Sequence, residues 1–241
     1  MQQSKLSPAT VGYCGRRKRY ILITIIAVPA IAGALIFASQ QHPYGSSILL
    51  NFDSYGNNSI DKTFIRIDTG APHSKGIWVI KTDPTAPTIP HILARLSDGE
   101  SSSDYHMLIK RVGIYSNLQA GVKFKIISGE QSIAGLIIRF QDSDRYFILQ
   151  ADARNHKFSL CRAQPGIILC TQDKDAYLAM GQWHSIVAQV AGVGGEPGIV
   201  GYLDGIRLIQ RYDQNYMTGG QIGLWTKGDT TVYFDDLEAN Y

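Results

Sequence analysis

Glutamate is scarce in this chain. A glycosidase needs two carboxyl groups, one on each side of the bond that it cleaves, and acids that share one face of a strand must alternate along it. No glutamate belongs to such an alternation, and Asp142 and Asp144 bracket a QDSD segment that is typical of a turn. The neighbours Asp235 and Asp236 would point to opposite faces of a strand. The sequence therefore disfavours catalysis by a strand with paired acids. The only glutamates among the 241 residues are Glu100, Glu130, Glu196 and Glu238.

Other reactive patterns are also missing. Gly192–Gly198 is rich in glycine but precedes no helical pattern, so it does not resemble a phosphate-binding loop. Ser185 lacks the glycines of a nucleophile elbow. His184 lies beside it in a strand pattern that faces the core, where a structural histidine is more common than a base. Cysteine and histidine do not occur in pairs at the spacing of a zinc site.

Acidic residues are absent from the first 39 positions, which contain five basic residues. Since the whole chain has 23 basic and 20 acidic residues, the remainder has 18 basic and 20 acidic residues and is nearly neutral. A neutral domain gives no electrostatic reason to expect a nucleic-acid partner. The basic residues of the N-terminal segment are Lys5, Arg16, Arg17, Lys18 and Arg19.

One apolar run is long enough to cross a bilayer. Residues 20–38 carry no charge, and about 20 apolar residues span the hydrocarbon core as a helix. The basic cluster directly before this run predicts a cytoplasmic N-terminus, and Pro29 is tolerated in a membrane helix. We therefore expect a cytoplasmic basic tail (1–19), a transmembrane signal anchor (20–39), a linker (40–47) and an exported domain (48–241).

A cleaved signal peptide would have the same order of features, with Ala32-Gly33-Ala34 as a small-residue cleavage site. The apolar run is longer than that of a usual signal peptide, which favours an uncleaved anchor. A buried core helix is a third interpretation, but the adjacent basic cluster argues against it. We expect a single-pass protein of the cell membrane, whose C-terminal domain is periplasmic or extracellular and whose residues 20–39 contact the lipid bilayer.

The exported part has the periodicity of β-strands. Trp183–Val190 and Thr231–Leu237 alternate between two faces and are rich in β-branched and aromatic residues. Asp204-Gly205 predicts a hairpin turn, because both residues tolerate positive φ. Many short strands separated by turn residues predict an all-β, two-sheet antiparallel sandwich. Further strands are expected at 48–52, 76–81, 91–96, 105–111, 119–128, 134–141, 146–152, 157–163 and 167–171.

Two segments have a different character. Residues 53–62 are rich in Asn, Gly and Ser and predict a loop, and residues 109–117 are the only stretch that resembles a helical turn.

The three cysteines fall into two groups. Cys14 precedes the apolar run, on the cytoplasmic side, and should stay reduced. If Pro165-Gly166 forms a two-residue turn, Cys161 faces Cys170 in a non-hydrogen-bonded pair, whose close approach suits a disulfide. Because Pro-Gly is not a favoured hairpin turn, a register shifted by one residue stays open, as do two small buried cysteines without a bond.

Several segments together resemble a bacterial domain family. They read DPTAPTIPHILA (83–94), LIIRFQDSDRYFILQADARNHKFSLCR (136–162), GQWHSIVAQV, YLDG and GGQIGLWTKGDTTVYFDDL. In order and spacing they resemble the 3-keto-disaccharide hydrolase-like domain of the concanavalin A-like, laminin-G-like lectin/glucanase superfold, over residues 48–240. The resemblance implies a jelly roll, a bacterial source, carbohydrate as the ligand class and, for some members, hydrolysis of 3-keto-glycosides.

The chain departs from the family at two positions. Gln150 and Asp152 stand where the family tends to have Arg and Asn. Losing a planar, fork-shaped donor weakens the recognition of a carboxylate or a vicinal diol, so a particular substrate is not carried over.

A sugar site needs an aromatic ring and a few convergent polar groups. On the predicted strands, such residues could share one concave face. In the alternative interpretation Trp225 belongs to the core, while Arg139 and Lys227 form a solvated face. The six candidates for carbohydrate binding are Arg139, Tyr146, Gln150, Trp225, Lys227 and Tyr233.

The resemblance also suggests a structural Ca²⁺, because jelly rolls of this kind often use one to join their first and last strands. Asp53 and Asp236 are the candidate ligands, since carboxylate oxygen suits this hard cation. In the alternative interpretation both aspartates cap turns.

Three hypotheses for function follow. The first is a membrane-anchored exported module that binds a glycan, or another component of the bacterial cell envelope, without catalysis. The second is a glycoside hydrolase acting on 3-keto-disaccharides or related glycans, which convergence of Asp142, Asp152 and Asp229 in one cleft would favour. The third is a structural or protein-interaction module with no sugar site. The absence of an acidic pair favours the non-catalytic hypotheses.

Overall fold

The computed structural model describes residues 45–69, 76–99, 102–193, 196–212 and 219–241. All of them belong to one compact unit, Ser39–Tyr241. The expected cytoplasmic tail, the expected anchor and the linker as far as residue 44 lie outside the described residues. Within the ranges that are described, no helix has the length and apolar character needed to cross a membrane.

The described chain is built almost entirely of strands. In order along the sequence, the elements are β1 (Ser47–Leu50), α1 (Asn57–Thr63), β2 (Phe64–Asp68), β3 (Ile77–Thr82), β4 (His91–Leu96), β5 (Tyr105–Lys110), β6 (Leu118–Ser128), β7 (Ile133–Asp142), β8 (Arg145–Asp152), β9 (Lys157–Gln164), β10 (Ile167–Asp175), β11 (His184–Val193), β12 (Glu196–Leu203), β13 (Ile206–Tyr212), β14 (Gln221–Lys227) and β15 (Thr231–Asn240).

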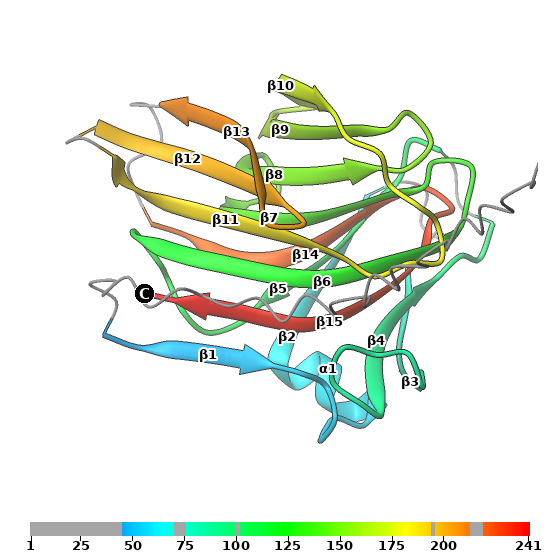
Figure 1. Ribbon diagram of the computed structural model, residues 1–241. Helices are drawn as coiled ribbons and strands as arrows, with labels where there is room; N and C mark the ends of the chain where they lie inside the picture. The colour runs from blue at the N-terminus through cyan, green and yellow to red at the C-terminus, as the bar shows by residue number, and fades with distance from the viewer. Residues whose placement is uncertain (1–44, 70–75, 100–101, 194–195, 213–218) are drawn as a thin grey trace, which may run out of the picture. The chain divides into compact units, whose positions relative to one another are not determined.

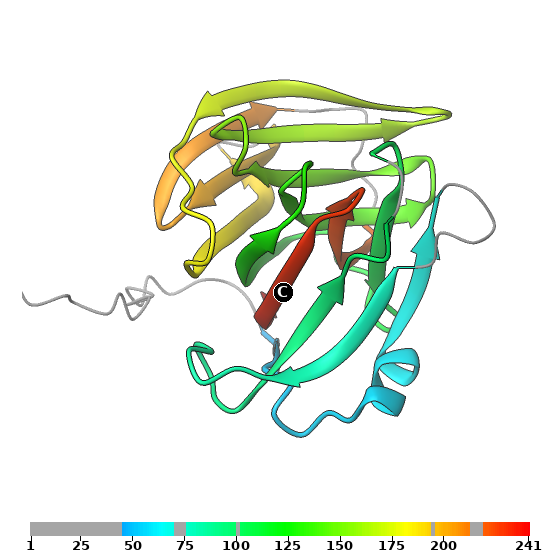
Figure 2. The same ribbon diagram turned by 90° about the vertical axis from the view of Figure 1, so that its right-hand side faces the viewer.

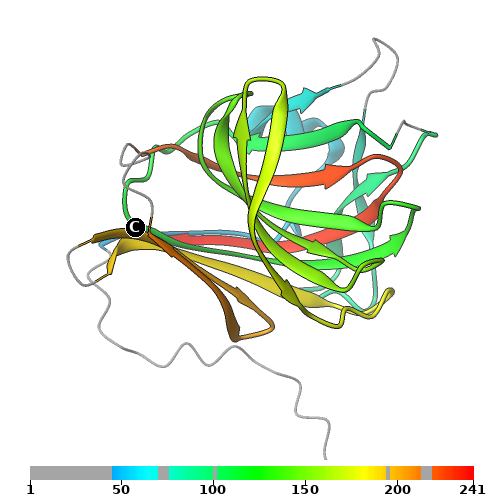
Figure 3. The same ribbon diagram turned by 90° about the horizontal axis from the view of Figure 1, so that it is seen from above.

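Two antiparallel sheets lie face to face (Figures 1 and 3). Sheet A has the order β13-β12-β11-β6-β15-β4-β3, with β1 also paired to β15. Sheet B has the order β10-β9-β8-β7-β14-β5-β2. The two C-terminal strands are central, since β15 lies between β6 and β4 and β14 lies between β7 and β5. The all-β, two-sheet prediction is confirmed.

The main core fills the space between the two sheets. Sheet A contributes Phe124 and Phe234, and sheet B contributes Leu136, Phe147 and Leu149, all of which are buried. These side chains alternate along their strands with residues that point away from the core, as the period of a strand requires. The core therefore follows from the alternation that the sequence shows.

Two local predictions were wrong. Residues 109–117 form no helical turn: β5 continues to Lys110, and Tyr115 forms an isolated bridge with Gly220. The segment predicted as a loop at 53–62 contains most of the short helix α1. Ile60 of α1 is fully buried in the main core, and packing of this kind stabilises short helices whose own propensity is weak.

A disulfide joins the two cysteines of the β9–β10 hairpin, with an S–S distance of 2.08 Å. Ile167 pairs with Gln164 across the Pro165-Gly166 turn, and Cys170 pairs with Cys161. The unshifted two-residue register is therefore the one that the structure adopts.

Replacing Cys161 and Cys170 by alanine should lower the free energy of unfolding by about 2–3 kcal/mol, because the bond limits the entropy of a short loop in the unfolded chain. Urea unfolding should show a lower midpoint, and the reduced wild-type protein should match the variant. A wild-type protein that is equally stable with and without reductant would contradict this prediction.

Candidate functional site

The outer face of sheet B, which points away from sheet A, carries a second apolar cluster. Met107, Ile137 and Ile148 on this face are fully buried, and Trp225 is only 1% exposed. Nevertheless, no second sheet covers this face in the described part of the chain. A flat sheet of one layer would leave such side chains open to water, so this sheet must coil around them.

A cavity of about 330 Å³ shows how strongly sheet B coils. Tyr105 of β5 and Ile167 of β10 both line it, although these strands lie five places apart in the sheet. When the pairing is followed from strand to strand across sheet B, Tyr105 lies at the same level as Asp175. Asp175 is eight residues along β10 from Ile167. In a flat sheet these two corners would be roughly 35 Å apart, at about 4.8 Å per strand and 3.3 Å per residue.

We call this space between two diagonal corners of sheet B the corner cavity. In Figure 2 the turns at the ends of β7–β8 and β9–β10 lie at the upper right, beside the upper end of β5. The lining residues are Thr69, Ser103, Asp104, Tyr105, Ser143, Asp144, Tyr146, Ala163, Gln164, Gly166, Ile167 and Ile168.

Two tyrosines line the corner cavity, of which Tyr105 is partly exposed and Tyr146 is only 2% exposed. The ring of Tyr105 stacks on Trp225, with 5.4 Å between ring centroids, and Tyr146 packs against Phe140 at 5.6 Å. Burial raises the pKa of the Tyr146 hydroxyl, so at neutral pH this group is an uncharged hydroxyl that can donate or accept a hydrogen bond. Hydroxyls from Thr69, Ser103 and Ser143 add polar groups to the walls.

A second hollow of about 420 Å³ adjoins the corner cavity and shares Asp144 and Gln164 with it. Arg145 and Arg162 bring positive charge to this hollow. Arg145 Nε donates to Asp142 Oδ2 at 2.7 Å, and this hydrogen bond holds the pKa of the Asp142 carboxyl below its usual value. The two hollows together form a polar surface along the β7–β8 and β9–β10 turns.

Of the six predicted sugar-binding residues, Tyr146 alone lines the corner cavity. Trp225 lies behind Tyr105 and its ring stacks on that of the tyrosine. Gln150 contacts the disulfide, with its Nε2 3.6 Å from Cys170 Sγ. Lys227 is paired in the ladder with Tyr105 and is partly exposed.

The remaining two candidates lie elsewhere. Arg139 is buried, and its φ of 53° falls at a bulge of β7 between Ile138 and Asp142. Tyr233 belongs to β15 in sheet A, whereas Trp225 belongs to β14 in sheet B. The six residues therefore do not share one concave face.

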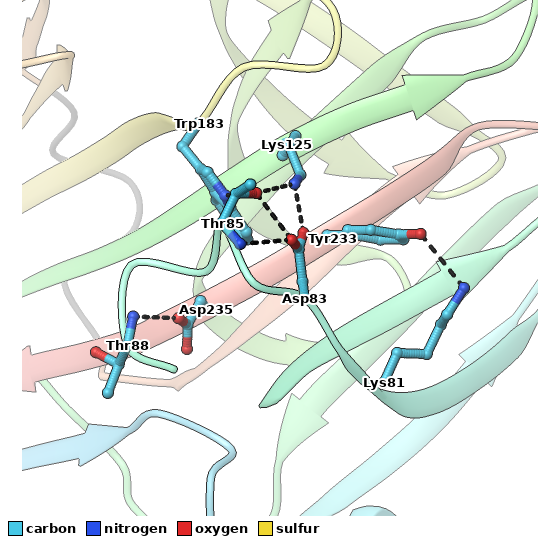
Figure 4. Close-up of polar contacts among 8 residues, drawn as sticks. All are labelled: Lys81, Asp83, Thr85, Thr88, Lys125, Trp183, Tyr233 and Asp235. Carbon is cyan, nitrogen blue, oxygen red and sulfur yellow. Dashed lines mark hydrogen bonds and ion pairs between the residues drawn. The ribbon is translucent and has the colours of Figure 1, made fainter. Parts of the chain in front are cut away.

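Tyr233 is part of a cluster on the outer face of sheet A (Figure 4). The ammonium of Lys125 lies 4.9 Å from the ring centroid of Trp183 and 5.3 Å from that of Tyr233, both within cation–π range. It also donates to Thr85 Oγ1 at 2.7 Å and forms a buried ion pair with Asp83. The ammonium of Lys125 therefore already lies against both rings. Its contacts with Asp83 and Thr85 attach the segment 83–90 to sheet A.

A group of carboxylates lies beside the same segment. The N–H of Thr88 donates to Asp235 Oδ2 at 2.9 Å, and its hydroxyl donates to Asp236 Oδ1 at 2.8 Å. A register shift between Asp235 and Glu238, together with a φ of 46° at Asp236, breaks the alternation of the strand. The expectation that Asp235 and Asp236 point to opposite faces was therefore wrong, since both reach Thr88.

Each predicted calcium ligand has a protein partner. The N–H of His91 donates to Asp53 Oδ1 at 3.0 Å, and Lys123 Nζ donates to Asp236 Oδ2 at 2.7 Å. The described residues contain no group of three or more His, Cys, Asp or Glu that could hold a metal ion. The arrangement does not fit a ready-made Ca²⁺ cage, and the calcium site stays a prediction.

Burial raises the pKa of Asp235 to about 7, and the charges of Asp236 and Asp53 act in the same direction. Because an unfolded aspartate titrates near pH 3.9, the folded protein holds the Asp235 proton more tightly than the unfolded chain. Protonated Asp235 therefore contributes full stability below about pH 4. That contribution is lost as the pH rises through 7.

We expect the free energy of unfolding in urea to decrease from about pH 4 to pH 8, and the Asp235→Asn variant to show a smaller decrease. Asp173→Asn is the matched control, because this aspartate is exposed and should leave the slope unchanged. If Ca²⁺ binds here, added Ca²⁺ should restore the stability at pH 8. An Asp235→Asn variant with the slope of the wild type would contradict the assignment.

Sequence reasoning missed most of the residues that line the corner cavity. Asp104, Tyr105, Asp144 and Gln164 lie at strand ends and turns. The QDSD turn (141–144) and the Pro165-Gly166 turn are visible in the sequence, but nothing local shows that they approach the start of β5.

Neither a protein-family model nor a curated protein sequence matches the chain. Solved structures do match its shape. The carbohydrate-binding module CBM66 of Bacillus subtilis has a TM-score of 0.57 at 15% identity, with 74% of this chain and 97% of the module covered. The chain shares with such structures a two-sheet jelly-roll fold. No match supports the finer resemblance to the 3-keto-disaccharide hydrolase-like domain.

Two further structures show the same architecture. Domain 4 of the extracellular arabinanase AbnA from Geobacillus stearothermophilus, solved with arabinotriose, has a TM-score of 0.53 at 11% identity, with 80% of this chain and 92% of that domain covered. The β-glucanase of Bacillus licheniformis has a TM-score of 0.53 at 12% identity, with 82% and 98% covered. At such identities the likeness establishes the fold alone.

Proposed function

We propose that the domain binds a glycan in the corner cavity, without catalysis, and that residues 20–39 anchor it to the outer side of a bacterial cell membrane. The observation that carries this proposal is the meeting of two tyrosine-lined corners of sheet B in one cavity of about 330 Å³. That volume lies at the lower end of the range for small-ligand sites, so it suits a short glycan or the end of a longer one.

The chemistry of the walls supports a ligand rich in hydroxyl groups. The partly exposed Tyr105 offers apolar ring surface together with a hydroxyl, and Tyr146 lies behind it, almost buried. Gln164 can both donate and accept hydrogen bonds, and Asp144 accepts them. Two structures that share the fold agree with the proposal: CBM66 is a carbohydrate-binding module, and domain 4 of AbnA was solved with arabinotriose.

The membrane part of the proposal is based on the sequence. The uncharged run 20–38 follows directly after four basic residues, which is the pattern of an anchor with its N-terminus in the cytoplasm. The disulfide of the β9–β10 hairpin agrees with an exported domain, since such bonds persist outside the cytosol.

The acids that would favour a hydrolase do not converge. Asp229 accepts hydrogen bonds from the N–H groups of Glu130 and Gln131. Asp152 accepts from Asn155, and Asp142 is bound by Arg145. Asp142 pairs with Arg145 at one end of β7, whereas Asp152 pairs with Ile133 at the other end, so the three carboxylates do not meet in one place.

A hydrolase acting on 3-keto-disaccharides or related glycans is the second candidate, and one observation favours it. Asp104 and Asp144 line the same cavity from opposite corners, and glycoside hydrolysis needs two carboxyl groups on either side of the scissile bond. Release of reducing ends from a bound glycan would distinguish this activity from simple binding.

The binding proposal can be tested by a glycan array probed with the full chain in detergent. Tyr105→Phe and Gln164→Ala should each weaken binding of a retained glycan about three- to tenfold, the usual effect of losing one hydrogen bond. Tyr212→Phe and Gln210→Ala are matched controls, because both residues lie on β13 in sheet A, and they should bind as the wild type does.

Three results would speak against the proposal. Folded protein that retains no glycan would favour a structural or protein-interaction module. Binding that all four variants share with the wild type would place the glycan elsewhere. If replacing Asp104 by asparagine abolishes glycan cleavage while glycan binding persists, the domain is a hydrolase.

A further inference from the structure

We infer that one end of the domain rests on a lipid bilayer through the loop between β5 and β6. Val112 and Ile114 in this loop are 74% and 79% exposed. Contiguous exposed apolar side chains mark interaction surfaces, and only Gly113 separates these two residues in the loop. The inference rests on the proposed membrane anchoring but not on glycan binding.

The exposed loop lies where the described chain begins. Ser46 and Tyr241 exchange backbone hydrogen bonds of 3.1 and 2.9 Å, and the ring of Tyr241 lies 4.7 Å from that of Tyr115. In Figure 1 the start of β1, the start of β6 and the C-terminus lie together at the left. The loop is therefore beside the segment that follows the expected anchor.

The protein holds this loop in place. The ammonium of Lys110 and the hydroxyl of Tyr115 both donate to the carbonyl oxygen of Val112. The side-chain amide of Gln221 donates to the carbonyl oxygens of Lys110 and Arg111, at 2.8 and 2.9 Å. These bonds fix the backbone around Val112 while the side chains of Val112 and Ile114 stay in solvent.

A bilayer is the partner that the chain itself indicates. The apolar run ends at Ala38, eight residues before Ser46, and eight residues reach at most about 28 Å. An anchored domain must therefore keep the end with Ser46 near the membrane. Exposed Arg111 beside Val112 suits anionic headgroups, and Tyr241, which is partly exposed, is of a type enriched at membrane interfaces.

The opposite end of the domain provides a matched control. Ile206 is 63% exposed and follows the Asp204-Gly205 turn of the β12–β13 hairpin. Leu203, just before this turn, pairs with Ile186 near the start of β11, whereas Val190, near the other end of β11, pairs with Leu118 at the start of β6. Ile206 therefore lies far along the strands from Val112 and Ile114, although it is similarly exposed and apolar.

The test uses the full chain with Cys14→Ser, reconstituted in vesicles that contain phosphatidylglycerol. Ile114→Cys and Ile206→Cys are labelled separately with an environment-sensitive fluorophore, and lipids with a nitroxide on the acyl chain serve as quenchers. We expect a blue shift and strong quenching at position 114, and the emission and quenching of a water-exposed probe at position 206. Both substitutions replace exposed side chains, so both variants should fold.

The failure of anchoring can be separated from the failure of the inference. Flotation after carbonate extraction first shows whether the chain is inserted in the vesicles. If it floats and the probe at 114 remains in water, the inference is overturned and anchoring stands. If the blue shift at 114 also occurs in the unit Ser39–Tyr241 without vesicles or detergent, the loop contacts protein, and the inference is again overturned.

If the chain does not float, the proposal of membrane anchoring fails. The inference about the loop is then tested with the domain alone, tethered to vesicles. The unit Ser39–Tyr241 contains all three apolar clusters, so it carries its own core. A histidine tag before Ser39 binds it to vesicles that carry chelated nickel, at about the distance that the anchor would impose. Quenching at 114 but not at 206 supports the inference, and equal behaviour of the two probes overturns it.

Discussion

Sheet B has apolar side chains on both faces, whereas sheet A covers only one of them, and the rest of the site depends on how this conflict is resolved. The sheet coils until Met107, Ile148 and Trp225 cover one another. Gly135 makes the packing possible, because a Cβ there would come within 2.8 Å of Ile148 Cγ2 and 3.4 Å of Trp225 Cε3. Coiling brings diagonal corners together, and the corner cavity is the space that remains between them.

Local patterns were enough to predict most of the strands, although not β2, and one hairpin in detail. The Pro165-Gly166 turn and two cysteines at equal distances from it specify the register of β9 and β10, and the structure has that register. Alternation likewise identifies Phe147 and Leu149 as residues of one face. These predictions succeed because neighbours in the sequence determine them.

The site could not be predicted in the same way. Tyr233 and Trp225 are only eight positions apart, yet β15 and β14 belong to different sheets, and this depends on pairing with distant strands. Bulges at Arg139 and after Asp235 interrupt the alternation that the sequence reasoning assumed. The corner cavity depends on the coiling of a seven-stranded sheet, which no single segment encodes.

The corner cavity depends on the coiling of sheet B, and the distance between the two corners of the sheet reports this coiling. Pulsed electron paramagnetic resonance measures this distance between spin labels at Ser103→Cys and Ile167→Cys. The labelled protein also carries Cys14→Ser, and its native disulfide is intact. The account predicts one narrow distribution well short of the roughly 35 Å that a flat sheet would impose. A distribution centred near that value would mean that the corners do not meet and that the corner cavity does not exist in solution.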